Sequence, residues 1–454
     1  MGCTTPRHAA GGIGTERLSR RKVLLGACSA LLGGTGAAIA ARVEDSLENG
    51  LSDYAGDTIP GSPERETPVV VKIGVVAVQA SGVDTLPGGA RDKIEGQAAR
   101  IEREMDGAYR FVIEYYNDDS KPDGTGERGR GQYSKEQLKR IAKEYYELGR
   151  HSLILVVMNI GDEVENMGDI LGVATQDSSL PLAILRMPSA VSSEVIAHEL
   201  GHLLSPQCIG MGLGHELMMN CRLFDAKSGK ITRAYAFNTI QKLLDDGCDL
   251  VRNPGGEVNQ YASPYSVMGN IATFSAKDKR QPQPLFSPPQ MAFLSPFINP
   301  ILEKLEEKES VYELSRGHDS SCFAVEVELP ESHALRKLLP EAEKLFFGLI
   351  VSSTINDKVN IDNMGSGAYE VGVFATWQDG RKTALLDVSP PLYDGAKEKA
   401  IYADEDLNFI AVAGHNDDGT PYVRFVELNT PEGTSIMGEA QRQAAEQNRQ
   451  IVGG

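Results

Sequence analysis

The stretch SSEVIAHELGHLLSPQCIGMGLGHELMMN, residues 192–220, decides which fold this chain is expected to adopt. His198 and His202 are four positions apart, so on a helix both imidazoles project from one face and can bind one metal ion. Ser193 is a suitable N-cap and Pro206 ends the apolar segment, which is typical of a buried helix. Neutral imidazole is a preferred ligand of Zn²⁺, so the pattern predicts a zinc site.

Glu199, beside the first histidine, adds a possible chemical function to this site. A carboxylate next to a zinc ligand can take a proton from a water that the metal has acidified. The alternative is a solvated helix with two unrelated histidines, but the apolar context VIAHELGHLL is typical of a buried helix instead. The sequence therefore favours a catalytic zinc site with Glu199 as the general base.

The third ligand follows from a resemblance. The sequence resembles the metzincins, zinc endopeptidases with the motif HExxHxxGxxH, in which a glycine bends the chain and brings a third histidine to the metal. Here Ser205 and Cys208 stand at the glycine and histidine positions. Removing SPQCIGM, residues 205–211, leaves HELGHLLGLGH, which matches the motif throughout. The resemblance thus implies a seven-residue insertion, with Gly212 at the bend and His215 as the third ligand.

Other third ligands remain open at this point. The Cys208 thiolate is one alternative, and a carboxylate such as Glu216 or Asp225 is another. Cys208 has a competing role, because it and Cys221 flank His215 by seven and six residues. We expect a disulfide between these two cysteines that closes the insertion and holds His215 toward the metal.

A second segment carries the same resemblance. The stretch YSVMG around Met268 is similar to the methionine turn that lies under the metal in metzincins. Some members have a tyrosine two residues after this methionine, but Asn270 occupies the place here, so no tyrosine role is implied. The segments SVMGN, FSPPQMAFLSP and LLDVSPP are faintly similar to the gametolysin and immune-inhibitor-A branches.

The N-terminal region is expected to direct export. Residues 1–40 combine Ser-Arg-Arg-Lys, an uncharged glycine-rich stretch and Ala-Ile-Ala, as in a signal peptide of the twin-arginine type. Lipidation at Cys28 is an alternative way of processing. Residues 41–67 are polar, which indicates a linker or a short pro-segment. Within them YAGDT resembles the astacin pro-segment, and this resemblance implies Asp57 as a possible latency switch.

Two further domains are expected after residue 67. Strand-like and helical patterns alternate over 68–309, which predicts a mixed sheet with an active-site helix in an α+β zincin domain. A charged helix is expected at 301–309. Short strands separated by turn signals over 310–430 predict an all-β, sandwich-like domain, and 431–454 is expected to be a polar tail.

Charge and composition exclude some partners and cofactors. A formal net charge of −18 argues against binding to nucleic acid or to anionic membranes, because phosphates attract clustered Lys and Arg. We expect no membrane span in the mature form. The acidic stretches 117–124, 360–363 and 416–419 could bind Ca²⁺, but turn formation explains each of them, so Ca²⁺ is not supported.

The predicted function is hydrolysis of protein or peptide substrates by an exported zinc endopeptidase, with one catalytic Zn²⁺. Two alternatives stay open: a catalytically silent zinc-containing adhesin or binding protein, and a zinc amidohydrolase that acts on cell-wall peptides. An intact Glu199 argues against the silent protein, because a structural zinc site needs no general base.

Overall fold

The protein is described by a computed structural model that covers residues 68–452 with gaps, the longest being 79–88, 270–284, 315–323, 352–368 and 389–397. The predicted signal peptide, Cys28 and the segment 41–67 with Asp57 lie outside the described residues. Over the described part of the chain, no helix is both long enough and apolar enough to cross a bilayer.

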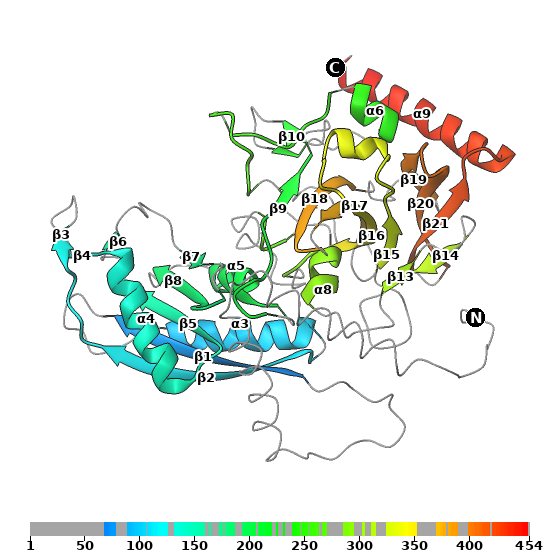
Figure 1. The fold of residues 1–454 in the computed structure, drawn as a ribbon. Coiled ribbons are helices and arrows are strands. Elements are labelled where there is room, and N and C mark those ends of the chain that lie inside the picture. Colours follow the sequence, from blue (N-terminus) through cyan, green and yellow to red (C-terminus); the bar gives the residue numbers. More distant parts are fainter. Residues whose placement is uncertain are drawn as a thin grey trace, which may run out of the picture. The chain divides into compact units, whose positions relative to one another are not determined.

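The first region is built on a five-stranded mixed sheet with the order β2-β1-β5-β8-β7 (Figure 1). Its strands are β1 (Val69–Val78), β2 (Tyr109–Asp118), β5 (Leu153–Met158), β7 (Gly172–Thr175) and β8 (Leu182–Arg186). The first four in this order run parallel, and β7 runs antiparallel to β8 at the edge. Parallel strands buried on both faces read as continuous apolar runs, as LILVVM does in β5.

Helices cover both faces of this sheet. Successive side chains of β5 alternate, so Leu155 packs with α3 (Ala90–Glu104) and α5 (Glu194–Leu203), and Val156 packs with α4 (Lys135–Gly149) on the other side. Helix α4 begins at a Ser134 cap, whose hydroxyl accepts a hydrogen bond from the Gln137 N–H at 3.1 Å.

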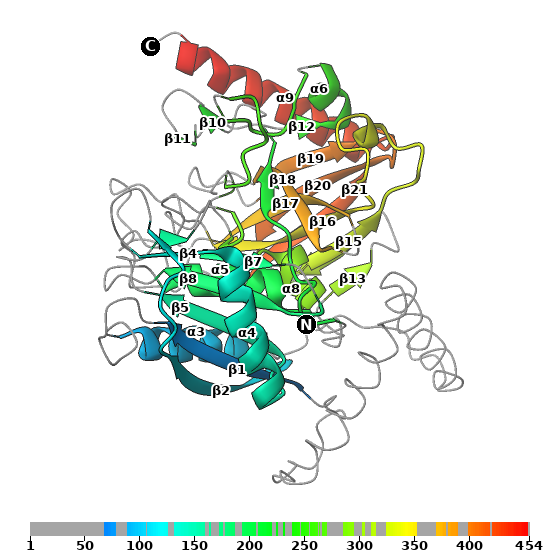
Figure 2. The same cartoon turned by 60° about the vertical axis from the view of Figure 1, so that its left-hand side comes forward.

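The second region is a sandwich of two further sheets (Figure 2). One has six strands: β13 (Leu302–Lys304), β15 (Ala324–Glu328), β16 (Lys344–Val351), β17 (Tyr369–Trp377), β18 (Lys382–Val388) and β9 (Glu216–Met218). The other has five: β12 (Asn238–Thr239), β19 (Glu398–Asp404), β20 (Phe409–His415), β21 (Pro421–Glu427) and β14 (Val311–Glu313). Phe347 from the first sheet and Phe409 and Phe425 from the second meet in the buried core between them.

Shorter elements complete the fold. Small sheets are formed by β3 (Gly124–Thr125), β4 (Gly131–Tyr133) and β6 (Glu163–Val164), and by β10 (Phe224–Asp225) and β11 (Lys230–Ile231). The remaining helices are α6 (Ile240–Asp245), α8 (Pro288–Leu294), the 3₁₀ helix η1 (Ala334–Lys337) and α9 (Pro431–Val452). Helix α8 begins at Pro288, and it packs against β16 so closely that a Cβ at Gly348 would lie 2.6 Å from Pro288.

The predicted fold class is confirmed: a mixed α/β region that carries the helix with His198 and His202 is followed by mainly antiparallel sheets packed as a sandwich. Two local expectations differ from the structure. Within 301–309, where a helix was expected, Leu302–Lys304 instead pairs with β15 as strand β13. In the stretch expected to be a polar tail, Pro431–Val452 forms helix α9, which buries Ala440 and Ala444 against β19, β20 and β21.

The two regions share sheets across the predicted boundary at residue 309. Strand β9 pairs in parallel with β18, and β12 pairs in parallel with β19, although β9 and β12 precede the boundary in sequence. Residues from Thr67 onward accordingly form one compact unit. The segment after the active-site helix therefore belongs to the sandwich as much as to the α/β region.

Candidate metal centre

Helix α5 presents two buried histidines on one face. His198 and His202 are only 2% and 8% exposed, and apolar residues of the helix pack into the core beneath the mixed sheet. The helix begins after Ser193, although the serine hydroxyl makes no capping hydrogen bond to the helix backbone. It ends at Leu204, whose extended conformation turns the chain away.

The chain then returns to the helix and brings His215 to the same place. The Gly212 N–H donates to the His202 carbonyl at 3.0 Å, and the Leu213 N–H donates to the Gly201 carbonyl at 2.7 Å. A Cβ at Gly212 would collide with the carbonyl oxygens of Gly201 and Leu204, so only glycine permits this approach. The insertion thus forms a loop that starts and finishes at the end of α5, as the motif resemblance implied.

Three histidine nitrogens converge. One ligand nitrogen of each of His198, His202 and His215 lies within 4.8 Å of those of the other two, and this is the group with metal-ligand geometry among the described residues. Cys208 and Glu216 are not part of it, and the side chain of Asp225 lies outside the described residues. The structure therefore brings the three histidines of the sequence-derived ligand set together, without Cys208 or Glu216.

The hydrogen bonds of the two helix histidines show that a cation fits between them. His198 Nδ1 lies 2.7 Å from the Val267 carbonyl oxygen, and His202 Nδ1 lies 2.8 Å from the Leu213 carbonyl oxygen. A carbonyl only accepts, so both Nδ1 atoms carry the proton and both Nε2 atoms present lone pairs. These Nε2 atoms are 3.1 Å apart. Tetrahedral zinc with bonds of about 2.0–2.1 Å separates its ligand nitrogens by about 3.3 Å.

Electrostatics favour the neutral, metal-binding form of these rings. Burial lowers the pKa of His198 to about 3, and the neighbouring His202 and His215 contribute to this shift. Burial lowers the pKa of His215 to about 4. The His215 Nε2 atom is buried and has no hydrogen-bond partner among the described residues. Three neutral imidazoles that face one another are a donor set suited to Zn²⁺, and one of them has a buried ring nitrogen with no hydrogen-bond partner among the described residues.

Glu199 lies beside this cluster under the edge strand β7. Its side chain is 4% exposed and accepts a hydrogen bond from the Ala174 backbone. A Cβ at Gly172 would lie 2.5 Å from Glu199 Oε1, so the glycine lets the strand pass directly over the carboxylate. Burial raises the pKa of Glu199 to about 8, and Oε2 has no hydrogen-bond partner within the described part of the chain.

Met268 lies under the helix, as the methionine-turn resemblance implied. A Cβ at Gly201 would lie 2.5 Å from the Met268 sulfur, so the sulfur packs against the helix backbone between the two histidines. The preceding residue, Val267, supplies the carbonyl that orients His198. The Met268 carbonyl in turn accepts a hydrogen bond from the Glu216 N–H at 3.0 Å, which ties the turn to strand β9.

Tyr261 is a site residue that the sequence did not reveal. Its ring packs edge-on against His215, with centroids 5.0 Å apart, and lies 6.0 Å from the His198 ring. Half of the residue is exposed, so the phenol stands at the rim of the metal centre. It is anchored through Asn259, whose side chain accepts a hydrogen bond from the Tyr261 N–H. Asn270, where the resemblance placed no tyrosine, lies outside the described residues.

Glu216 lies at the centre in a role other than the one expected from the sequence. It is fully buried next to His215, and Ser263 donates a short hydrogen bond to its Oε1. Burial raises its pKa to about 7, although the hydroxyls of Ser263, Ser287 and Thr383 favour the charged form. The sequence offered Glu216 as a possible ligand, but the structure directs its carboxylate into this hydroxyl cluster instead.

The described residues include only part of the candidate disulfide and of the acidic stretches. Cys221 is outside the described residues, so its pairing with Cys208 stays a prediction. In the 117–124 stretch, the Ser120 N–H donates to Asp118, which is a turn interaction, and 416–419 closes through Asn416 and Thr420. Residues 360–363 lie outside the described part of the chain.

Comparison with known proteins finds similarity in structure only. No protein-family model and no curated protein matches this chain. Metalloproteinase-II from Bacteroides fragilis is similar over 37% of this chain and 49% of its own, with 18% identity and a TM-score of 0.22. The match thus spans about half of that protein. Catalytically inactive OgpA from Akkermansia muciniphila, in complex with an O-glycopeptide, is similar over 72% of this chain and 94% of its own, with 12% identity and a TM-score of 0.25. At these values the two structures give no information about substrate or mechanism.

Proposed function

We propose that this protein is a zinc-dependent endopeptidase. The observation that carries the proposal is the convergence of three neutral imidazoles, from His198, His202 and His215, beside the buried carboxylate of Glu199. When bound there, Zn²⁺ supplies Lewis-acid chemistry, which polarises a carbonyl group and makes a water molecule more acidic.

Glu199 provides the proton transfer. Its free Oε2 accepts a proton from the attacking water and then gives it to the amine nitrogen of the cleaved peptide bond. In the metal-free protein burial holds its pKa at about 8, and a nearby divalent cation favours the carboxylate form, which is the form that accepts a proton. The Ala174 N–H fixes the carboxylate in place, so little reorganisation is needed.

The edge of β7 and the Tyr261 phenol can position a substrate. Within the described residues β7 pairs only with β8, so its other edge offers backbone groups to an extended peptide. Tyr261 has its hydroxyl at the rim of the centre, where it can donate a hydrogen bond to the oxygen on which negative charge develops. Both features favour a peptide over a compact small molecule as the substrate.

Export belongs to the same proposal. The twin-arginine-like segment within residues 1–40 supports it, since a peptidase that acts on external proteins must leave the cytoplasm. Cleavage after this segment would give a mature chain beginning near residue 41.

The test combines metal content with hydrolysis of casein or gelatin. Wild type should contain one zinc per chain and cleave, and His215→Ala should lose both, because two imidazoles do not complete the site. His415→Ala is the matched control, since His415 is the last residue of β20 and not one of the three ligands. Both properties should remain in that variant.

Two results would contradict the proposal. If His215→Ala keeps its zinc, the ligand set is wrong. If wild type binds zinc but cleaves neither protein, a silent zinc-binding protein or a cell-wall amidohydrolase becomes the better description, and peptidoglycan fragments are the next substrate to examine.

A further inference from the structure

The metal ligands come from two different layers of the protein. His198 and His202 lie on α5, which packs against the mixed sheet. His215 directly precedes β9, which pairs in parallel with β18 of the sandwich, with Glu216 opposite Thr383. The position of the third ligand therefore depends on the sandwich.

Arg381, in the turn before β18, makes two hydrogen bonds to the segment that carries the third ligand. Its Nε donates to the Gly212 carbonyl at 2.7 Å, and its own carbonyl accepts from the Gly214 N–H at 2.9 Å. The two bonds bracket Leu213. The Leu213 carbonyl is the group that holds His202 Nδ1 at 2.8 Å.

Arg381 thus acts on two ligands at once. By fixing Gly212 and Gly214 it orients the Leu213 carbonyl toward His202 and sets where His215 enters the site. Metal-ligating histidines depend on such outer contacts for ring orientation, and loss of one typically weakens metal binding. The turn itself is held, since Gly380, with φ of 90°, lies against α8, where an added Cβ would be 3.3 Å from the Pro289 carbonyl oxygen.

We propose that Arg381 is a positioning residue of the metal centre, through which the C-terminal sandwich sets the affinity for zinc. This inference rests on the proposed zinc site, but not on any peptidase activity. The hydrogen bonding of Arg381 and its charge predict opposite changes in zinc affinity when this residue is replaced. A guanidinium near a cation site repels the cation, so removal of its charge alone would strengthen zinc binding, whereas loss of the side-chain hydrogen bond from Nε to the Gly212 carbonyl would weaken it.

The experiment measures the zinc dissociation constant by competition with a chromogenic chelator in the full mature chain. Arg381→Ala should bind zinc about 10–100-fold more weakly. Arg381→Lys keeps the charge and one donor group, and should recover part of this loss. In Co²⁺-substituted protein the visible absorption should change in Arg381→Ala, because the ligand geometry changes.

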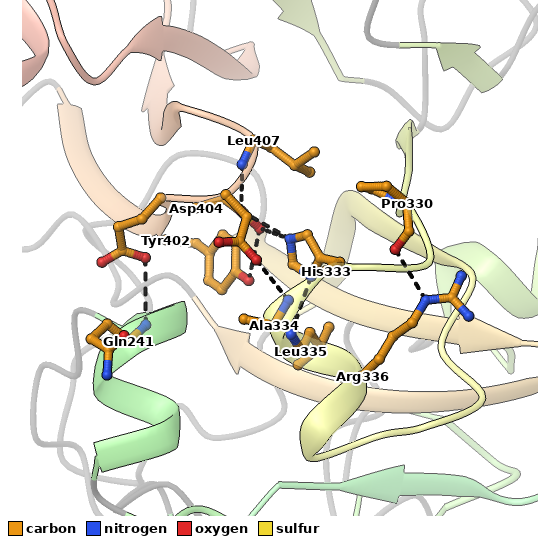
Figure 3. Close-up of polar contacts among 11 residues, drawn as sticks. Gln241, Pro330, His333, Ala334, Leu335, Arg336, Tyr402, Asp404 and Leu407 are labelled. Atoms are coloured by element: carbon orange, nitrogen blue, oxygen red, sulfur yellow. Dashed lines mark hydrogen bonds and ion pairs between the residues drawn. The ribbon is translucent and has the colours of Figure 1, made fainter.

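Arg336→Ala is the matched control. Arg336 is likewise half-buried in the sandwich region and donates to backbone carbonyls, with Nε 3.2 Å from Pro330 O (Figure 3) and Nη2 3.1 Å from Leu329 O. Its removal should leave the zinc affinity and the Co²⁺ spectrum unchanged. Thermal unfolding of the metal-free variants shows how much each arginine contributes to the fold alone.

Three results would overturn the inference. Unchanged or tighter zinc binding by Arg381→Ala would show that the side-chain hydrogen bond to Gly212 does not position the ligands. An equal loss in Arg336→Ala would reduce the effect to general stability. If Arg381→Ala does not fold, Arg381→Lys decides the matter, and wild-type affinity and spectrum in that variant would refute the positioning role. Failure of wild type to bind zinc would instead refute the proposed function itself.

Discussion

Two buried histidine clusters in this protein have opposite hydrogen-bonding patterns. In the sandwich, His333 Nε2 lies 3.0 and 3.1 Å from the two carboxylate oxygens of Asp404, and His333 Nδ1 accepts from the Leu335 N–H (Figure 3). The proton is therefore on Nε2 and is donated to the carboxylate. At the metal centre the protons of His198 and His202 are on Nδ1, and the Nε2 atoms face one another.

The difference separates a structural cluster from a functional one. Asp404 also accepts from the Leu407 N–H and the Tyr402 hydroxyl, so the sandwich cluster is fully bonded. The metal centre instead leaves Glu199 Oε2 and His215 Nε2 buried without partners among the described residues. Unsatisfied buried polar atoms destabilise a fold, and two of them beside three converging imidazole nitrogens indicate that a ligand belongs there.

The largest expected effect is on catalysis. Glu199→Gln removes the proton acceptor but keeps the shape of the side chain, so kcat should fall by about 10³-fold or more. Zinc content should stay at the wild-type level, because Glu199 is not one of the three ligands. Loss of zinc in this variant, or retention of most activity, would mean that Glu199 has another role.

The next effect is on stability. Asp404→Ala leaves His333, Tyr402 and the Leu407 N–H without their buried acceptor and should lower the free energy of unfolding by about 3 kcal/mol. Urea unfolding measures this. The folded fraction should still bind zinc normally. A stable Asp404→Ala protein would remove the contrast between the two clusters.

A smaller effect, of opposite sign, is expected at Glu216. Its folded-state pKa of about 7 exceeds the ordinary 4.5, so the folded state retains a proton that the unfolded state releases. Stability of the metal-free protein should therefore fall as pH rises from about 4.5 to about 7. Glu216→Gln cannot ionise and should be more stable than wild type by about 2 kcal/mol at pH 8.

Glu326→Gln is the control for this prediction. Glu326 is also buried, but Lys344 lies 3.0 Å from its carboxylate, so its neutralisation should destabilise the protein instead. Equal behaviour of the two variants over pH would show that the buried charge of Glu216 is not the cause.

The smallest effect is expected at Tyr261. Tyr261→Phe keeps the ring against His215 but removes the hydroxyl, so kcat should fall about tenfold with little change in KM, as for a donor that acts in the transition state. A rise in KM with unchanged kcat would instead assign Tyr261 to substrate binding.

The sequence was informative where the chemistry is local. The spacing of His198, Glu199 and His202 specifies one face of one helix, and the deletion of 205–211 restored a motif that pointed to His215. The apolar runs of the mixed sheet are equally local signals, as in VVVKIGVVAV, which forms strand β1 (Val69–Val78).

The remaining features depend on contacts that are distant in sequence. Tyr261 reaches the centre because its loop is anchored on both sides, by Asn259 to Val251 and by Ser263 to Glu216. No periodicity encodes such an arrangement. Leu302–Lys304 shows the reverse case: the stretch ILEKLEEKE has a strong helical preference, but these three residues pair with β15 as strand β13.

The pairing of β9 with β18 also has a consequence for the order of events during synthesis. Glu216 and Thr383 are opposite one another but 167 residues apart in the chain. At a synthesis rate of about 5–20 residues per second, roughly ten seconds or more pass between the emergence of the two strands. A growing chain therefore exposes the histidine pair of α5 well before the strand that fixes the third ligand exists. Completion of the candidate metal centre is therefore delayed until most of the polypeptide has been made.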